Sequence, residues 1–355
     1  MDIGWEMKYW LKVGIILFLI VGSIVQANNL VSFKDVSFLL NNFSNVGGFF
    51  PLKTKCHVKE VSEQFLVISP ECLIQKPVVY IPFKKSVDLM WPRIRDVEGI
   101  YRLDKDEFIY TGAKILLDPD FEREAQNFWD KRLSWGSYMM LKGTKKDIQI
   151  PLSYFAWKYF KNYSFWVSTK SLSGRDDCRL TNYRVAMDKL DGLVLAPEEE
   201  YNFNKDLINI PQEDYCKGKS ERQYLFYAGV CGVSTQLFRN SLLNPFIRVV
   251  ERRSHAHRYP KFYNPIVLGD DAAVYEKYKL LKIKNISSTP LYFRVFQKNP
   301  KEVYLLSISS QKNPYKVKVK KKNLSELSAY VQKTIFSWED VLSNKKWTSV
   351  YYGFK

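Results

Sequence analysis

The chain has 355 residues, of which 46% are hydrophobic and 15% aromatic, and its formal net charge at pH 7 is +17. This apolar content is enough for a buried core and excludes an intrinsically disordered protein, and the length allows one large domain or two of ordinary size. The positive charge indicates an anionic partner, but charge alone does not choose among nucleic acid, lipid headgroups and an acidic wall polymer.

The N-terminus carries an apolar run from about residue 13 to residue 25, preceded by Lys8 and Lys12. The run is short for a membrane-spanning helix, which needs roughly 17 to 25 residues. Val25-Gln26-Ala27 resembles a small-residue cleavage site. We therefore expect residues 1–27 to be either a cleaved signal peptide or an uncleaved signal-anchor helix. Either one places the rest of the chain outside the cytoplasm, in the cell envelope or secreted, and argues against nucleic acid as the partner.

Export also changes how the cysteines are interpreted, because disulfides form in oxidising compartments. The five cysteines are Cys56, Cys72, Cys178, Cys216 and Cys231. The first two flank a strand-like segment, and the next two flank the stretch just before Cys231. Two such bridges would leave Cys231 as an odd thiol, which in an exported protein is a candidate reactive group.

Residues 28–163 are predicted to form a mixed α+β domain of unknown role. Strands are expected over 78–83 and 107–111, and a helix from Asp118 to Arg132 with Asp118 or Asp120 as its cap. We find no chemistry-bearing constellation in this half of the chain, since His57 has no second metal-spaced pair.

Beyond residue 163 the pattern predicts further helices and strands. A helix is expected from Thr181 to Leu190, with Gly192 as its stop. Short strands are expected over 193–195 and 247–250. Three more strands, separated by turn residues, indicate an antiparallel meander, and they cover residues 278–283, 291–296 and 303–308.

The last segment, 311–355, is predicted to be a basic strand followed by a C-terminal helix. Residues 312–322 hold six lysines and no acid, which is typical of a solvated strand face or of attachment to an anionic surface. The helix is expected after Asn323, where Glu326 completes a capping-box pattern.

The residues that indicate chemistry lie between these segments. Cys231 follows a small-residue turn and begins a predicted helix, and within thirty residues come His255 and His257, two of the three histidines in the chain. A thiol at a helix start with a histidine nearby suits nucleophilic catalysis, whereas the alternative is a buried structural cysteine before a core helix. A zinc site would need a fourth ligand that we cannot place, so we expect no metal and no cofactor.

Several blocks in order resemble the VanW-type domain, a family of exported bacterial envelope proteins, over about residues 166–296. Residues 229–238, Gly-Val-Cys-Gly-Val-Ser-Thr-Gln-Leu-Phe, resemble the family core Gly-Gly-Gly-Val-Cys-Gln-Val-Ser-Thr-Thr-Leu-Phe. Glu251-Arg252 with His255, followed by residues 269–274, resembles Glu-Arg-x-x-His and Gly-x-Asp-Ala-Thr-Val. Two departures matter: residues 227–228 replace two glycines, and Gly232 replaces the Gln after the cysteine.

Some members of that family act as cysteine peptidoglycan transpeptidases that make L,D cross-links. The resemblance therefore implies an α+β, VanW-like domain over 164–310, with a helix after the cysteine motif and the β-meander, that acts on peptidoglycan stem peptides. An anionic wall polymer or membrane surface is the second expected partner. In this interpretation Cys231 is the nucleophile and His255 the acid/base. Asp271 either orients His255 or is only a turn residue.

The remaining candidates concern the oxyanion and the substrate. The backbone at Gly229 and Gly232 is expected to approach the substrate closely and offer N–H donors. Ser234 either joins this set or satisfies the helix start. Glu251 and Arg252 either bind the charged termini of the substrate or form a structural ion pair.

Two alternatives stay open at this point. The chain can be a non-catalytic peptidoglycan- or wall-polymer-binding module with a decayed Cys-His site, which the missing Gln and glycines favour. It can also be a cysteine hydrolase or amidase that uses water as the acceptor.

Overall fold

The computed structural model describes residues 58–61, 64–68, 81–99, 106–130, 148–173, 175–208, 212–219, 224–225, 227–257, 269–275, 278–338 and 340–352. The expected signal segment, Cys56, His57 and Cys72 lie outside these residues. Among the described helices, none is long and apolar enough to cross a membrane.

The chain divides into two compact units, one of residues up to 79 with 128–152, and the other of residues 80–127 with 153–355. The segment expected to be one N-terminal domain, 28–163, is therefore shared between them. The physical reason is long-range pairing: β4 (Glu107–Tyr110) lies in one sheet with β16 (Tyr315–Ser325), far along the chain.

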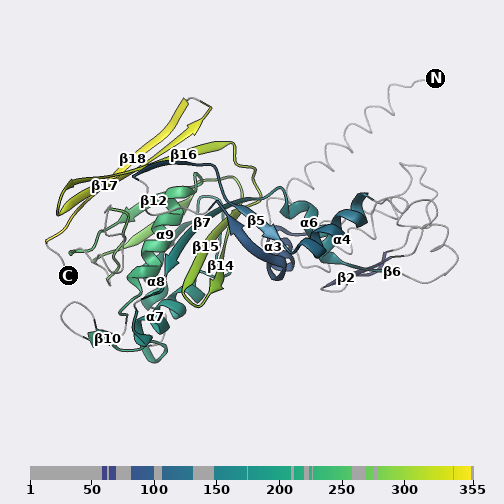
Figure 1. The fold of residues 1–355 in the computed structure, drawn as a ribbon, viewed down its shortest axis with the longest axis horizontal. Helices are drawn as coiled ribbons and strands as arrows, with labels where there is room; N and C mark the ends of the chain where they lie inside the picture. Colours follow the sequence, from purple (N-terminus) through teal and green to yellow (C-terminus); the bar gives the residue numbers. More distant parts are fainter. Residues whose placement is uncertain are drawn as a thin grey trace, which may run out of the picture. The chain divides into compact units, whose positions relative to one another are not determined.

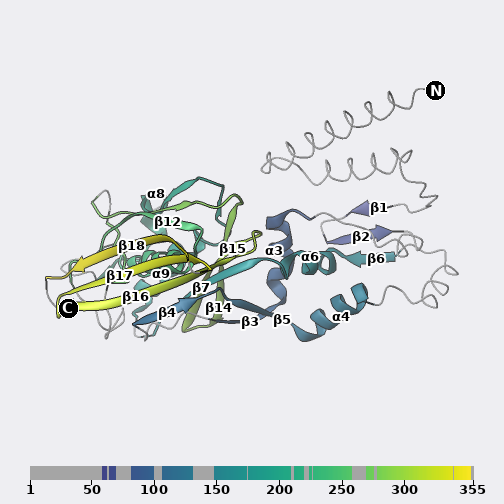
Figure 2. The same cartoon turned by 90° about the horizontal axis from the view of Figure 1, so that it is seen from above.

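The first unit contains a small antiparallel sheet in the order β1-β2-β6 (Figure 2). Its strands are β1 (Val58–Val61), β2 (Phe65–Ile68) and β6 (Ile148–Pro151).

The second unit holds most of the described helices and strands. Its longer helices are α3 (Phe83–Met90), α4 (Pro119–Asp130, which runs on past residue 127), α6 (Leu152–Phe160), α7 (Asp177–Asp188) and α9 (Cys231–Leu243). Its short helices are η2 (Trp91–Arg93), α8 (Phe203–Ile208) and η3 (Gln212–Asp214). Its remaining strands up to residue 225 are β3 (Ile94–Glu98), β5 (Lys114–Leu117), β7 (Ser164–Ser171), β8 (Val194–Leu195), β9 (Glu200–Asn202), β10 (Gly218–Lys219) and β11 (Tyr224–Leu225). Its later strands are β12 (Ile247–Arg252), β13 (Leu281–Asn285), β14 (Leu291–Asn299), β15 (Glu302–Ser309), β17 (Ser328–Ser337) and β18 (Asp340–Val350).

These strands form antiparallel sheets, and with the helices they confirm the predicted α+β class. The orders are β7-β15-β14-β8, β12-β13-β9, β18-β17-β16-β4, β3-β5 and β10-β11. The strands expected over 291–296 and 303–308 form as β14 and β15, which pair with each other, whereas the strand expected over 278–283 begins only at Leu281, as β13. The first of the three, β13, instead joins β12 and β9, so the local turn pattern did not determine its partner.

Helix α9 runs through the middle of this unit (Figure 1), in contact with β7 and β15 and also with β12, β13 and β16. Every residue from Gly232 to Leu243 is buried. Its buried polar residues from Ser234 to Ser241 each make at least one side-chain hydrogen bond, as burial favours. Gln236 Nε2 donates to the carbonyls of Ser168 on β7 and Val303 on β15, each at 3.0 Å. This bidentate contact fixes the helix against the sheet that carries both strands.

The predicted C-terminal helix is wrong, because residues 315–350 form the meander β16-β17-β18. The apolar positions of this segment fit a period of two as well as the helical period. Along β17, Ala329, Val331, Lys333 and Ile335 are all buried on one face. β-Branched and aromatic residues dominate β17, and pairing on both edges decides in favour of the strand.

The lysine run of 312–322 is only partly a solvated face. Lys318 and Lys320 pair with Glu107 on β4. Lys321 is buried, and its Nζ lies 3.6 Å from Asp270 Oδ2. Three of the six lysines therefore form ion pairs with acidic residues of other segments. The exposed lysines of the run are Lys312, Lys316 and Lys322.

Two helix starts illustrate what local sequence does determine. Asp118 Oδ1 accepts from the backbone N–H of Asp120 and of Phe121 at the start of α4, as predicted. Helix α7 begins earlier than the expected Thr181, because the Asp176 carboxylate accepts from the Arg179 N–H at 2.8 Å.

Candidate active site

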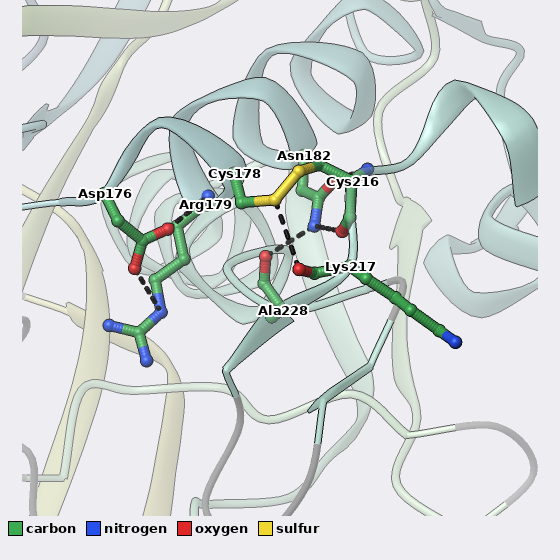
Figure 3. The surroundings of a disulfide bond; sticks show 7 residues. All are labelled: Asp176, Cys178, Arg179, Asn182, Cys216, Lys217 and Ala228. Atoms are coloured by element: carbon green, nitrogen blue, oxygen red, sulfur yellow. Dashed lines mark hydrogen bonds and ion pairs between the residues drawn. A yellow bond between two sulfur atoms is a disulfide. The ribbon is translucent and has the colours of Figure 1, made fainter.

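Side chains of helix α7 bind the segment that precedes Cys231 (Figure 3). Cys178 and Cys216 form a disulfide with a Cα–Cα distance of 5.0 Å, which confirms that predicted pair. Asn182 Nδ2 donates to the carbonyls of Cys216 and Ala228, each at 2.8 Å. The segment leading to the thiol is therefore fastened both covalently and by hydrogen bonds.

Gly229 is required at this turn. Its φ is +102°, and a Cβ atom there would lie 2.8 Å from the carbonyl oxygen of Arg179 on α7. A side chain is excluded by both the conformation and the close approach of α7. The structure thus gives this glycine a packing role against α7.

Cys231 is the first residue of α9, is half-buried, and is a free thiol among the described cysteines. Its Sγ lies 3.5 Å from the carbonyl oxygen of Val274. Burial raises the pKa of this thiol, but the hydrogen bond and positive charge of His255 outweigh burial, and the pKa falls below its usual value. The charge of Lys279 lowers it further, and the N-terminal end of a helix also favours a thiolate.

His255 follows β12 and is oriented by one carboxylate oxygen. Its backbone N–H donates to Asp271 Oδ2 at 2.8 Å, and its Nδ1 lies 2.6 Å from the same oxygen. Because Nδ1 is engaged with Asp271, Nε2 is the ring nitrogen left for the Cys231 thiol. Burial lowers the pKa of His255, but its hydrogen bonds with Asp271 and Cys231 prevail and raise the pKa to about 9.

Asp271 is fixed by contacts to its other oxygen. Oδ1 accepts from Arg252 Nη2 at 3.0 Å and from the Tyr351 hydroxyl at 2.6 Å. Burial raises the pKa of this carboxyl, yet the His255 hydrogen bond and the Arg252 charge hold it well below its usual range. Asp271 is therefore an ionised, immobilised partner for the imidazole.

The segment that carries Asp271 is positioned by α9 itself. The hydroxyls of Ser234 and Thr235 donate to the carbonyl of Ala272, at 2.6 and 3.2 Å. The N–H of Ala272 in turn donates to Thr235 Oγ1 at 3.0 Å. One helix thus supplies the thiol and also holds the segment with the carboxylate.

The structure brings three of the predicted site residues together, in the order Cys231, His255 and Asp271. It gives the others different tasks. The N–H of Gly232 donates to the carbonyl of Gly229 at 2.9 Å, so this donor is already engaged.

Glu251 pairs with Lys282 at 3.2 Å, which is the structural ion pair expected as one alternative. The Arg252 side chain is 2% exposed and donates to Asp271, Gly269 and Ser349, so it orients the aspartate. Ser234 is buried, as the helix-start alternative predicts.

Sequence analysis missed Tyr351. The residue lies 80 positions after Asp271 and carries no local motif, so no signal in the sequence connects them.

A free thiol at a helix start, hydrogen-bonded to an imidazole that a buried carboxylate orients, defines a Cys-His-Asp constellation on an α+β fold. Residues 178–305 match the family model described as VanW like protein, so this part of the chain is similar to that family. Neither a curated protein nor a solved structure matches the chain.

The coupled pair predicts a distinctive pH profile. Cys231 should react with iodoacetamide with a midpoint below the ordinary thiol value of about 8.5. The reason is that His255, with a pKa of about 9, stays protonated beside the thiolate. Replacing His255 by Gln removes that charge and should move the midpoint upward. Mass-spectrometric mapping of the Cys231 adduct from pH 5 to 10 measures both curves, and identical midpoints would contradict the pairing.

Proposed function

We propose that this chain is an exported cell-envelope protein that works as a cysteine-dependent peptidoglycan L,D-transpeptidase. The observation that supports it most is the hydrogen-bonded order Cys231, His255, Asp271 within a VanW-like domain. A decayed site would not be expected to retain a histidine that is hydrogen-bonded to both a thiol and an ionised carboxylate.

The chemistry follows from these groups. The Cys231 thiolate attacks the carbonyl carbon at the third residue of a stem peptide, and the C–N bond to the terminal D-Ala breaks. Protonated His255 gives its proton to the departing amine, which leaves as free D-Ala. An acceptor amine then attacks the thioester, neutral His255 takes its proton, and the new amide forms as the thiolate leaves. Asp271 keeps the imidazole aligned through both proton transfers.

The start of α9 contributes to the same steps. Tetrahedral intermediates at Cys231 carry a negative oxygen, and the positive end of the helix dipole lies at this residue. The site thus stabilises both the thiolate and the oxyanion.

Export and the envelope partners belong to the same proposal. The disulfide between Cys178 and Cys216 suits an oxidising compartment. The net charge of +17 suits contact with an anionic wall polymer or membrane surface.

The test is intact-mass spectrometry of the protein after incubation with a disaccharide-tetrapeptide. We expect an adduct with the mass of the donor less D-Ala on the wild type and none on Cys231→Ala, because only a thiolate at this position can form the thioester. Addition of an acceptor stem separates transfer, which gives a cross-linked product, from hydrolysis, which gives a tripeptide.

A folded wild-type protein with reduced Cys231 and no adduct would reject the transpeptidase. It would leave the non-catalytic binding module as the better account.

A further inference from the structure

The side chain of Arg175 fills the space beside Gly232, the residue after the candidate nucleophile. A Cβ atom on residue 232 would lie 2.7 Å from Nη2 and 3.0 Å from Nη1 of Arg175. Because Cβ atoms do not approach other atoms this closely, the guanidinium takes the space in which a side chain at position 232 would begin. The guanidinium of Arg175 can therefore lie here only because residue 232 has no side chain.

Arg175 rests on a rigid support. Its guanidinium carbon lies 4.9 Å from the centre of the Tyr183 ring, in a cation–π contact. Tyr183 is fully buried, and its hydroxyl donates to Gln236, which in turn is bound to the carbonyls of β7 and β15. The position of the guanidinium is thus determined by the same helix that begins with Cys231.

Within the described part of the chain, no residue accepts a hydrogen bond from the guanidinium of Arg175. The guanidinium makes no hydrogen bond or ion pair with any residue that the structure describes, apart from its contact with the Tyr183 ring. The neighbouring carboxylate, Asp176, is engaged by the side chain of Arg179 and caps α7. A half-buried fork of N–H donors beside a nucleophile is arranged to receive an anion from solution.

We propose that Arg175 binds the free carboxylate of the amino acid that leaves when Cys231 is acylated, and that it thereby restricts the donor to peptides ending one residue after the cleaved bond. This inference rests on the proposed acyl transfer. In such a donor only the Cα atom separates the scissile nitrogen from the terminal carboxylate. The carboxylate therefore stays close to the reacting carbonyl, where a cation next to the nucleophile can bind it. The leaving amino acid takes its proton from His255 and keeps its carboxylate unchanged. An amidated or extended peptide has no carboxylate at this place.

The first experiment compares acylation of Cys231 by a disaccharide-tetrapeptide and by its C-terminal amide. We expect the wild type to react roughly 10- to 100-fold faster with the free acid than with the amide. The reason is that the amide lacks the carboxylate that would pair with the Arg175 cation. Arg175→Gln should lose most of this preference, and Arg175→Lys should keep part of it. Arg184→Gln, an exposed arginine on α7, is the matched control and should behave as wild type. Full preference retained in Arg175→Gln would overturn the proposal.

A second experiment does not depend on the substrate. Iodoacetate and iodoacetamide alkylate thiolates and differ in carrying a carboxylate or an amide. The ratio of their rates at Cys231 should fall roughly 3- to 10-fold in Arg175→Gln, since near a protein surface the loss of one favourable charge contact amounts to about that factor. It should stay unchanged in Arg184→Gln. Gly232→Ala should lower the ratio as well, because the new methyl group displaces the guanidinium.

The two experiments separate the two proposals. A ratio that falls only in Arg175→Gln and Gly232→Ala, together with no peptide adduct on any variant, would support the carboxylate site and reject the transpeptidase. An unchanged ratio in Arg175→Gln would reject the carboxylate site even if the peptide adduct forms.

Discussion

Replacing Asp271 by Asn is expected to slow acylation of Cys231 by roughly 10²- to 10⁴-fold, the range that general acid–base catalysis contributes, with the upper end typical of a triad that loses its aspartate. The carboxylate accepts from His255 through Oδ2 and from Arg252 and Tyr351 through Oδ1. The amide of Asn carries no charge, so the imidazolium loses its counter-ion and the pKa of His255 should fall from about 9. The thiol pKa should rise in turn, and less thiolate is present at neutral pH.

Two rates measure this effect: acylation by the stem peptide and alkylation of Cys231 by iodoacetamide at pH 7. Both should fall, the first further than the second, because alkylation needs no proton transfer. Tyr351→Phe is the matched control, since it removes one hydrogen bond and leaves the carboxylate, and we expect less than a roughly 10-fold change. Wild-type rates in a folded Asn variant would reduce Asp271 to a turn residue.

Replacing Asp270 by Asn is expected to have the largest effect on stability. This carboxylate is 2% exposed and lies between two buried cations. Arg239 Nη2 is 3.1 Å from Oδ1, and Lys321 Nζ is 3.6 Å from Oδ2. Burial raises the pKa of Asp270, but the charges of Arg239 and Lys321 lower it below its usual value. The Asn variant has no negative charge at this position. The cations of Arg239 and Lys321 then remain in the interior without this counter-ion, which costs about 3–5 kcal/mol.

The free energy of unfolding in urea tests this expectation. Asp96→Asn is the control, because Asp96 pairs with Lys298 at 2.8 Å on the surface and its loss should cost less than about 1 kcal/mol. The wild-type carboxylate also predicts an acid dependence. Because its pKa is lowered in the fold, its contribution is present above the unfolded value and is lost as the pH falls toward the folded one. Equal losses from the two Asn variants would show that Asp270 is not a buried counter-ion.

The sequence was informative where the signals are local. The thiol at a helix start and the two blocks around His255 and Asp271 were found from a motif, and the Cys178–Cys216 pair from the count and order of the cysteines. The helix at Asp118 has its own cap, and the strands after residue 280 are separated by turn residues. The helix cap and the turns have a physical cause within a few residues, whereas the disulfide joins cysteines 38 residues apart.

The sequence was uninformative where partners are distant. The pairing of β4 with β16 mixes the two halves of the chain, and no local pattern announces it. The same holds for Tyr351 at Asp271 and for Arg175 at Gly232. The C-terminal segment shows a second limit: its apolar spacing fits both periods, and the neighbouring strands select the extended form.

A lysine in that segment caps the C-terminal end of helix α9. Lys333 Nζ donates to the carbonyls of Ser241, Asn244 and Ile247, at 2.8, 2.6 and 2.9 Å. Tyr351, just after β18, holds the carboxylate at the other end of the same arrangement. Cys231 is thus synthesised well before the residues that complete its surroundings. Before β17, β18 and Tyr351 are synthesised and packed, Asp271 lacks one of its hydrogen bonds and α9 lacks its C-terminal cap, so the order of synthesis delays completion of this arrangement.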